Sequence, residues 1–153
     1  VKRIPGVADW PVKFTVSRIK QVYLENPDKV ERVRQQTWRD GHRTLTHNIK
    51  VPLGPGSNQE TEESITENAF RTFLQRTDPE RDPILKARMV FMYGDRIWEL
   101  DEVFTRHLNI LEIELDDLNE DLEFPPWLEI IREITGEDEF SNFAMSRKDW
   151  VHP

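Results

Sequence analysis

Charged residues of like sign recur along this chain in pairs that are two residues apart. Residues i and i+2 of a β-strand point to the same face of a sheet, so each pair presents two charges to one face. One such pair alone is typical of the solvated face of an antiparallel strand. The residue between is apolar in four of the five pairs, which are Arg32 with Arg34, Lys86 with Arg88, Glu60 with Glu62, Glu99 with Asp101, and Glu112 with Glu114. The series predicts a sheet with one charged face and one apolar face.

Turn sequences divide the chain into segments of strand length. Three motifs are typical of tight turns: Asn-Pro-Asp at 26–28, Asp-Gly at 40–41 and Tyr-Gly-Asp-Arg at 93–96. Residues 52–58 are typical of a loop rich in proline and glycine. Strands joined this closely pair antiparallel. The predicted strands are residues 17–24, 30–36, 43–50, 60–65, 84–91, 97–104 and 110–116.

Two short helices are expected outside the sheet. Residues 67–75 place their apolar side chains on one helical face, with Thr66 available as the N-cap. A terminal helix is expected near residues 141–147. Before it, residues 125–134 around Trp127 predict a lid that packs aromatic bulk on one end of the fold.

The predicted fold class is mostly β: an antiparallel closed β-barrel with a few peripheral helices. In a closed sheet the charged face can line the lumen, while the apolar face packs outward against the helices and the lid. The outward set is Val33, Leu45, Ile49, Leu111, Ile113 and Leu115. A length of 153 residues suits one domain, so residues 1–153 are expected to form a single domain.

Composition narrows the class of partner. The net charge of −8 disfavours binding to nucleic acid or to an anionic membrane. The chain has no cysteine, which excludes disulfides, thiolate metal sites and cysteine nucleophiles. No apolar run approaches the roughly 20 residues that span a bilayer, and no targeting segment is recognisable. We therefore expect a cytoplasmic protein, and a homodimer is left open.

The two signs of charge suit a polyanion bound together with metal ions. Guanidinium groups bind phosphate oxygens bidentately, and lysine acts as a mobile point charge. Lys50 adds a cation on a neighbouring strand. Carboxylates suit Mg²⁺ or Mn²⁺, which prefer oxygen ligands. An internal network of salt bridges is the alternative, disfavoured because buried ion pairs seldom offset their own desolvation.

Short motifs along nearly the whole chain resemble, in order, those of the CYTH superfamily, the triphosphate tunnel metalloenzymes. The motifs are IKQVYL at 19–24, VERVR at 30–34, HNIK at 47–50, ETE at 60–62, ILKAR at 84–88, WELD at 98–101 and LEIEL at 111–115. PWL at 126–128, REIT at 132–135 and FSN at 140–142 resemble the closing motifs of the bacterial members.

The resemblance implies a triphosphate tunnel that uses Mg²⁺ or Mn²⁺. It implies that the triphosphate is bound by Arg32, Arg34, Lys50, Lys86 and Arg88. It implies that metal is held, directly or through water, by Glu60, Glu62, Glu112 and Glu114. Catalytic roles fall to Lys50, Arg88 and Asp101, of which Asp101 matches the family's tunnel aspartate.

The chain departs from the family pattern at its start. The hallmark first strand, two alternating glutamates followed by a lysine, is absent, and residues 1–5 resemble the segment directly after that strand. Two alternatives stay open: the strand precedes the sequence given, or the domain lacks it. The second would remove metal ligands and leave the barrel with an open edge. The spacing after Asp101 also differs from the family's, so Glu102 and Phe104 receive no role. His47 and His107 are expected to be ordinary strand or loop histidines.

The implied function is metal-dependent hydrolysis of a triphosphate. Inorganic tripolyphosphate is the leading substrate because the resemblance is to compact bacterial members; thiamine triphosphate and nucleoside triphosphates stay open. The alternative within the family is an adenylate cyclase that makes cyclic AMP from ATP. The alternative from another class is a non-catalytic module that binds triphosphate groups.

Overall fold

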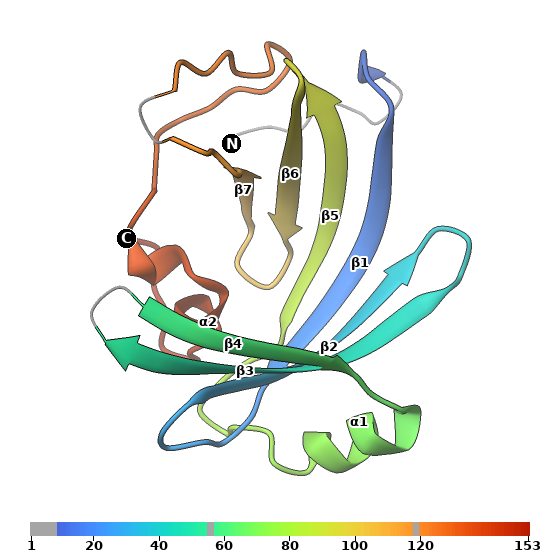
Figure 1. Cartoon of the computed structure of the whole chain (residues 1–153), viewed down its shortest axis with the longest axis vertical. Helices are drawn as coiled ribbons and strands as arrows, with labels where there is room; N and C mark the ends of the chain where they lie inside the picture. Colours follow the sequence, from blue (N-terminus) through green and yellow to red (C-terminus); the bar gives the residue numbers. More distant parts are fainter. Residues whose placement is uncertain (1–8, 55–56, 118–119) are drawn as a thin grey trace.

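A computed structural model describes residues 9–54, 57–117 and 120–153 of the chain. Its main feature is one antiparallel sheet of seven strands, in the order β4-β3-β2-β1-β5-β6-β7 (Figure 1). The strands are β1 (Phe14–Tyr23), β2 (Val30–Trp38), β3 (Arg43–Gly54), β4 (Ser57–Ser64), β5 (Ile84–Tyr93), β6 (Arg96–Val103) and β7 (Leu108–Ile113). All seven predicted strands are therefore confirmed, with shifted ends.

The sheet curls into a half-barrel (Figure 1). A cavity of about 210 Å³ is lined by residues of β2 and β3 and also of β6 and β7. The two halves of the sheet therefore curl toward each other around this cavity, and the face that lines it is the concave face. Within the described residues the sheet ends at β4 and β7, and these two edges are not paired with each other. The described residues therefore form an antiparallel half-barrel, as predicted in class, and they do not show the predicted closure.

The helices are short and lie outside the sheet. α1 (Glu67–Leu74) begins as predicted at Thr66, whose side-chain oxygen accepts a hydrogen bond from the Ala69 backbone N–H at 3.1 Å. The terminal helix is shorter than predicted: a 3₁₀ turn, η2 (Asp138–Phe140), precedes α2 (Asn142–Met145). No helix among the described residues is long and apolar enough to cross a membrane.

Apolar side chains of the convex face pack in two groups. Under α1, Val33 and Phe70 are buried together, with Leu45 packed against them. Around Trp98, the second group is bordered by half-buried Leu111 and Ile113. The outward packing predicted for these residues is therefore confirmed, while Ile49 and Leu115 are only half-buried.

The predicted lid is split between two places. Trp127 lies near the turn between β5 and β6: its ring is 5.3 Å from that of Tyr93, the last residue of β5, and 5.7 Å from that of Phe91 on the convex face. Contact with the aromatic side chains of β5 holds the Trp127 ring in this position. The concave face is closed at one end instead by Met145 of α2, fully buried against Tyr23 and its neighbours.

A buried polar cluster ties the end of α1 to the convex face. The Glu31 carboxylate accepts two hydrogen bonds from Arg76, each 2.9 Å, and lies 2.6 Å from His47 Nε2. The His47 ring stacks on Phe73 at 4.2 Å. The hydrogen bonds from Arg76 outweigh burial and, with those from His47 and Asn26, lower the pKa of Glu31 to about 2. Because its partners belong to this cluster, His47 lies on the convex face, on the opposite side of the sheet from the charged concave face.

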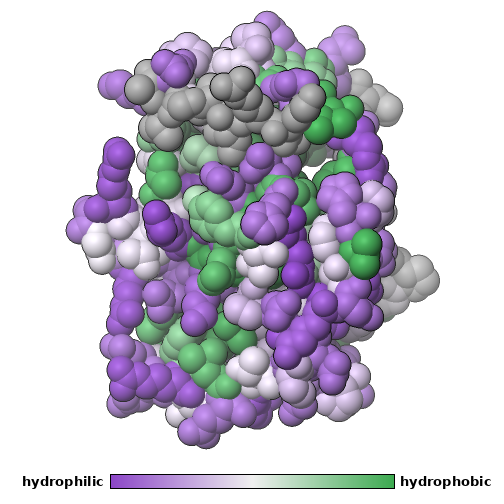
Figure 2. Space-filling view, turned by 180° about the vertical axis from the view of Figure 1, so that it is seen from behind, coloured by the Kyte–Doolittle hydropathy of each residue, from purple (hydrophilic) through white to green (hydrophobic). Residues whose placement is uncertain are grey.

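The outer surface is mainly hydrophilic where the molecule is seen from behind, with hydrophobic residues gathered in patches (Figure 2).

Candidate active site

The charged pairs of the strands share the concave face. Residues paired across neighbouring strands project to the same side of a sheet. Arg34 pairs with Gln21, Ser17 with Arg88, and Arg88 with Asp101. Because Ser17 and Gln21 are four residues apart on β1, all five side chains point the same way. The same register places with them Arg32, Lys50, Glu60, Glu62, Lys86, Glu99 and Glu112.

The two basic pairs of the concave face, Arg32 with Arg34 and Lys86 with Arg88, form a basic wall. Asp101 lies next to the second pair. Its carboxylate accepts a hydrogen bond from Lys86 Nζ at 2.8 Å and two from the Arg88 guanidinium, at 2.8 and 3.0 Å. Burial alone would raise the pKa of Asp101, but the bonds and charges of these two cations lower it. Burial lowers the pKa of Lys86, while Asp101 opposes that effect. Asp101 therefore holds two cations in place with one negative charge.

Arg34 is held by a neutral partner. Its Nε and Nη2 donate to Gln21 Oε1 at 2.9 and 2.7 Å, and Gln21 Nε2 donates to the Tyr23 hydroxyl at 2.7 Å. The pKa of Arg34 is lowered first by burial and then by the charges of Arg32 and Arg88. Three guanidinium groups thus lie near enough to repel one another, an arrangement that an anionic ligand would stabilise.

Arg32 and Lys50 line the enclosed cavity together with Asp101 and Glu112 from the opposite side. Arg32 Nη2 lies 3.7 Å from the carboxylate of Glu60. Arg32 Nε is buried and has no hydrogen-bond partner among the described residues. A buried donor without an acceptor is costly, so this nitrogen calls for an acceptor that a ligand can provide.

Three of the four predicted metal ligands lie on the two edge strands. Glu60 and Glu62 belong to β4, and Glu60 accepts a hydrogen bond from Asn48 at 2.7 Å. Glu112 belongs to β7. Glu114 lies beyond the end of β7, because the pairing with β6 stops at Ile113, and it does not line the cavity. The structure thus brings three of the four carboxylates onto the charged face.

The chemistry of these donors fits a hard divalent cation. Glu112 fits best: it makes no hydrogen bond or ion pair within the described part of the chain. The pKa of Glu112 is raised first by partial loss of water on its cavity side and then by the negative charge of Asp101. Among the described residues no group of three or more carboxylate or imidazole side chains is gathered to hold a metal. The carboxylates are divided between β4 and β7.

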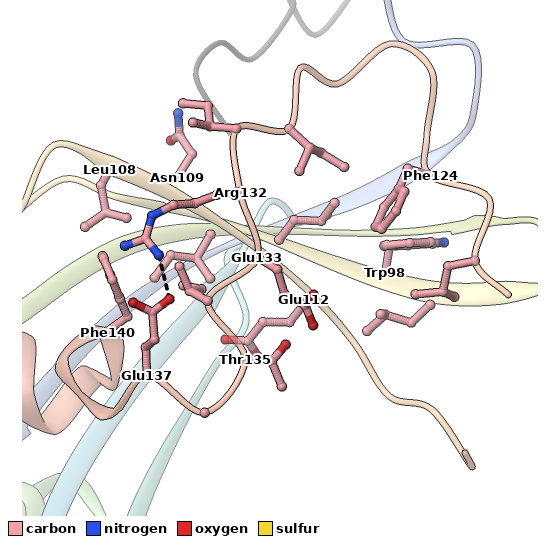
Figure 3. A pocket seen from close by; sticks show the side chains of 18 of the residues that line it. Trp98, Leu108, Asn109, Glu112, Phe124, Arg132, Glu133, Thr135, Glu137 and Phe140 are labelled. Atoms are coloured by element: carbon pink, nitrogen blue, oxygen red, sulfur yellow. Dashed lines mark hydrogen bonds and ion pairs between the residues drawn. The ribbon is translucent and has the colours of Figure 1, made fainter. Parts of the chain in front are cut away.

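A larger groove of about 1030 Å³ runs along the open edge of β7. It is bounded by β7 on one side and by residues 130–138 of the C-terminal segment on the other. Figure 3 shows Glu112, Glu133 and Thr135 near the middle of this groove, while Arg132 pairs with Glu137 toward α2. Glu112 lines both this groove and the charged cavity, so the two spaces adjoin at its side chain.

Sequence reasoning missed several residues of the cavity wall. Tyr23 and Asn48 line it, and both follow the alternation that had identified Arg32 and Lys50, so that signal could have found them. Asn142 also lines it but belongs to α2, and no strand pattern predicts its position.

Comparisons with known proteins give matches among solved structures. No protein-family model and no curated protein sequence matches the chain. The inorganic triphosphatase NE1496 matches with a TM-score of 0.66 at 22% identity, covering 95% of this chain and 89% of that one. A second structure of NE1496 gives 0.64 at 21% identity, covering 95% and 92%.

A further match is the PH1012 protein from Pyrococcus horikoshii OT3. Its TM-score is 0.50 at 23% identity, covering 71% of this chain and 67% of that one. At these identities the matches establish the fold. The fold of this chain is therefore that of the inorganic triphosphatase NE1496, as expected from the order of its motifs, and it extends over 95% of the chain.

Proposed function

We propose that this protein is a metal-dependent triphosphatase that hydrolyses inorganic tripolyphosphate on its concave face. The observation that carries the proposal is the buried, unpartnered Nε of Arg32 beside Lys50, in a cavity whose other wall carries Asp101 and Glu112. Cationic donors that lack acceptors suit phosphoryl oxygens, and carboxylates across the cavity suit the accompanying cation. The fold shared with an inorganic triphosphatase supports the same function.

In this proposal the basic residues bind and orient the triphosphate. Arg32 and Arg34 of β2 and Arg88 of β5 offer planar donors from the two strands that flank β1, and Lys50 adds a mobile charge on β3. Water attacks the terminal phosphorus, the bond to the bridging oxygen breaks, and pyrophosphate leaves while the water proton passes to the products. The fixed cations stabilise the charge that develops on the leaving group. Asp101 takes part by holding Lys86 and Arg88.

The carboxylates Glu60, Glu62 and Glu112 would hold Mg²⁺ or Mn²⁺, with Glu114 as a fourth candidate. A bound cation of this kind neutralises phosphoryl charge and lowers the pKa of bound water.

A closed tunnel belongs to the same proposal. The groove along β7 leaves room for a further strand whose backbone would pair with this edge of the sheet. Such a strand would shield Glu112 from bulk water and strengthen every charge interaction inside.

Phosphate release from tripolyphosphate tests the proposal. Purified protein is incubated with Mg²⁺ or Mn²⁺ and tripolyphosphate, and separately with thiamine triphosphate and with ATP, and products are resolved by chromatography. Arg32→Ala and Glu112→Gln should each reduce metal-dependent turnover at least about 100-fold. Arg71→Ala, which removes an exposed arginine of α1, is the matched control.

Each other outcome contradicts the proposal in a different way. Cyclic AMP from ATP identifies a cyclase, and triphosphate binding without turnover identifies a binding module. Full activity of Arg32→Ala shows that the concave face is not the active site.

A further inference from the structure

One contact with the basic wall comes from outside the sheet. Asn142, the first residue of α2, lines the cavity, and its Oδ1 accepts a hydrogen bond from Lys86 Nζ at 3.4 Å. Lys86 is only 1% exposed. Its other side-chain acceptor among the described residues is Asp101, at 2.8 Å. The buried ammonium therefore has two acceptors, one anionic and one neutral.

The neutral acceptor matters because the anionic one is shared. Asp101 also binds Arg88, whose Nη1 lies 3.3 Å from Glu99 as well, so Lys86 shares its only carboxylate partner among the described residues with a second cation. A buried ammonium needs polar contacts in place of water. A second carboxylate would supply such a contact but would cancel the remaining positive charge. An amide oxygen supplies the contact and leaves that charge available to an anion.

We infer that Asn142 is a positioning residue for triphosphate binding: it holds the ammonium of Lys86 through a neutral acceptor, so that the basic wall keeps its net positive charge. This inference rests on the function proposed above and deepens it. Asn142 does not have to touch the reacting atoms, because it acts through Lys86.

The anchoring of α2 makes this contact a fixed one. Met145 is fully buried at the end of the concave face. The Arg106 guanidinium donates to the Met145 carbonyl at 2.6 Å and to the Arg147 carbonyl at 2.8 Å. Arg81 donates to the hydroxyl of Ser146 at 2.9 Å. These bonds come from the loops before β5 and after β6, the two strands that carry Lys86 and Asp101.

Asn142→Asp separates a role in binding from a role in folding. The new carboxylate pairs with Lys86, so thermal unfolding should show a protein at least as stable as the wild type. Tripolyphosphate binding, measured by calorimetry in EDTA so that no turnover occurs, should weaken about ten- to hundredfold. In the metal-supported assay KM should rise more than kcat falls. Asn68→Asp makes the same charge change on exposed α1 and should leave both readouts unchanged.

Two results would overturn the inference. One is an Asn142→Asp protein that binds tripolyphosphate as tightly as the wild type. The other is a loss of affinity accompanied by an equal loss of stability, which assigns Asn142 to folding alone. A wild-type protein that neither binds nor hydrolyses tripolyphosphate contradicts the proposed function instead, and that result is obtained before any variant is made.

Discussion

Replacing Asp101 with asparagine removes the single negative charge that the structure places between Lys86 and Arg88. Asp101 is 3% exposed and Lys86 1%, so water cannot take over the lost contact. Removing one partner of a buried ion pair costs about 3–5 kcal/mol, because the other charge stays buried and uncompensated. For a chain of this size that loss corresponds to a fall in Tm of about 6–20 °C.

Thermal and urea unfolding at neutral pH measure this loss of stability. An unchanged m-value in urea would show that the variant exposes as much surface on unfolding as the wild type does. The double variant Asp101→Asn with Lys86→Met removes both charges and should recover part of the stability. An Asp101→Asn protein within about 1 kcal/mol of the wild type would refute the reasoning, since it would mean that water reaches the two cations.

The same charge gives stability a defined dependence on pH. The pKa of Asp101 is lower in the folded protein than in the unfolded chain. Its contribution is therefore complete above the ordinary pKa of an aspartate and is lost as the pH falls through the folded value. The difference in stability between wild type and Asp101→Asn should accordingly shrink in acid.

Further predictions concern parts of the fold away from the basic wall. Glu31, whose pKa is lowered to about 2, should contribute stability that is complete above pH 4.5 and disappears toward pH 2, and Glu31→Gln should remove that part of the urea midpoint's pH dependence. Thr66→Ala should cost about 1 kcal/mol in urea unfolding through loss of the N-cap of α1; no change would mean that the cap is replaced by water. Met145→Ala should cost about 2–5 kcal/mol, since Met145 is fully buried, and a smaller loss would show that α2 is not anchored.

Much of the sheet follows from short-range pattern. The alternation around Arg32 and Arg34, or around Lys86 and Arg88, depends only on the two-residue period of a strand, and the tight turns force neighbours to pair antiparallel. The concave face and its charged residues were predictable for that reason. The end of β7 was not, because Glu114 continues the pattern although its pairing with β6 has stopped at Ile113.

Contacts made by the C-terminal segment lay beyond such reasoning. Trp127 was expected to pack on one end of the fold, but its partners Trp10, Phe91 and Tyr93 were not predicted. Asn142 reaches Lys86 across 56 residues of sequence, a contact that requires α2 to be docked by Arg106. Neither position has a periodic signal, because each is decided by which apolar surface is left uncovered once the sheet has formed.

The sequence by itself determined that this chain forms an antiparallel sheet with one charged face, because the side to which each residue points is a local property of strand geometry. Only the tertiary structure decided which opposite charges meet, that β4 and β7 form the two edges of the sheet within the described residues, and that α2 closes one end of the cavity. Those features depend on register, curl and long-range packing, which bring together residues that no local period connects.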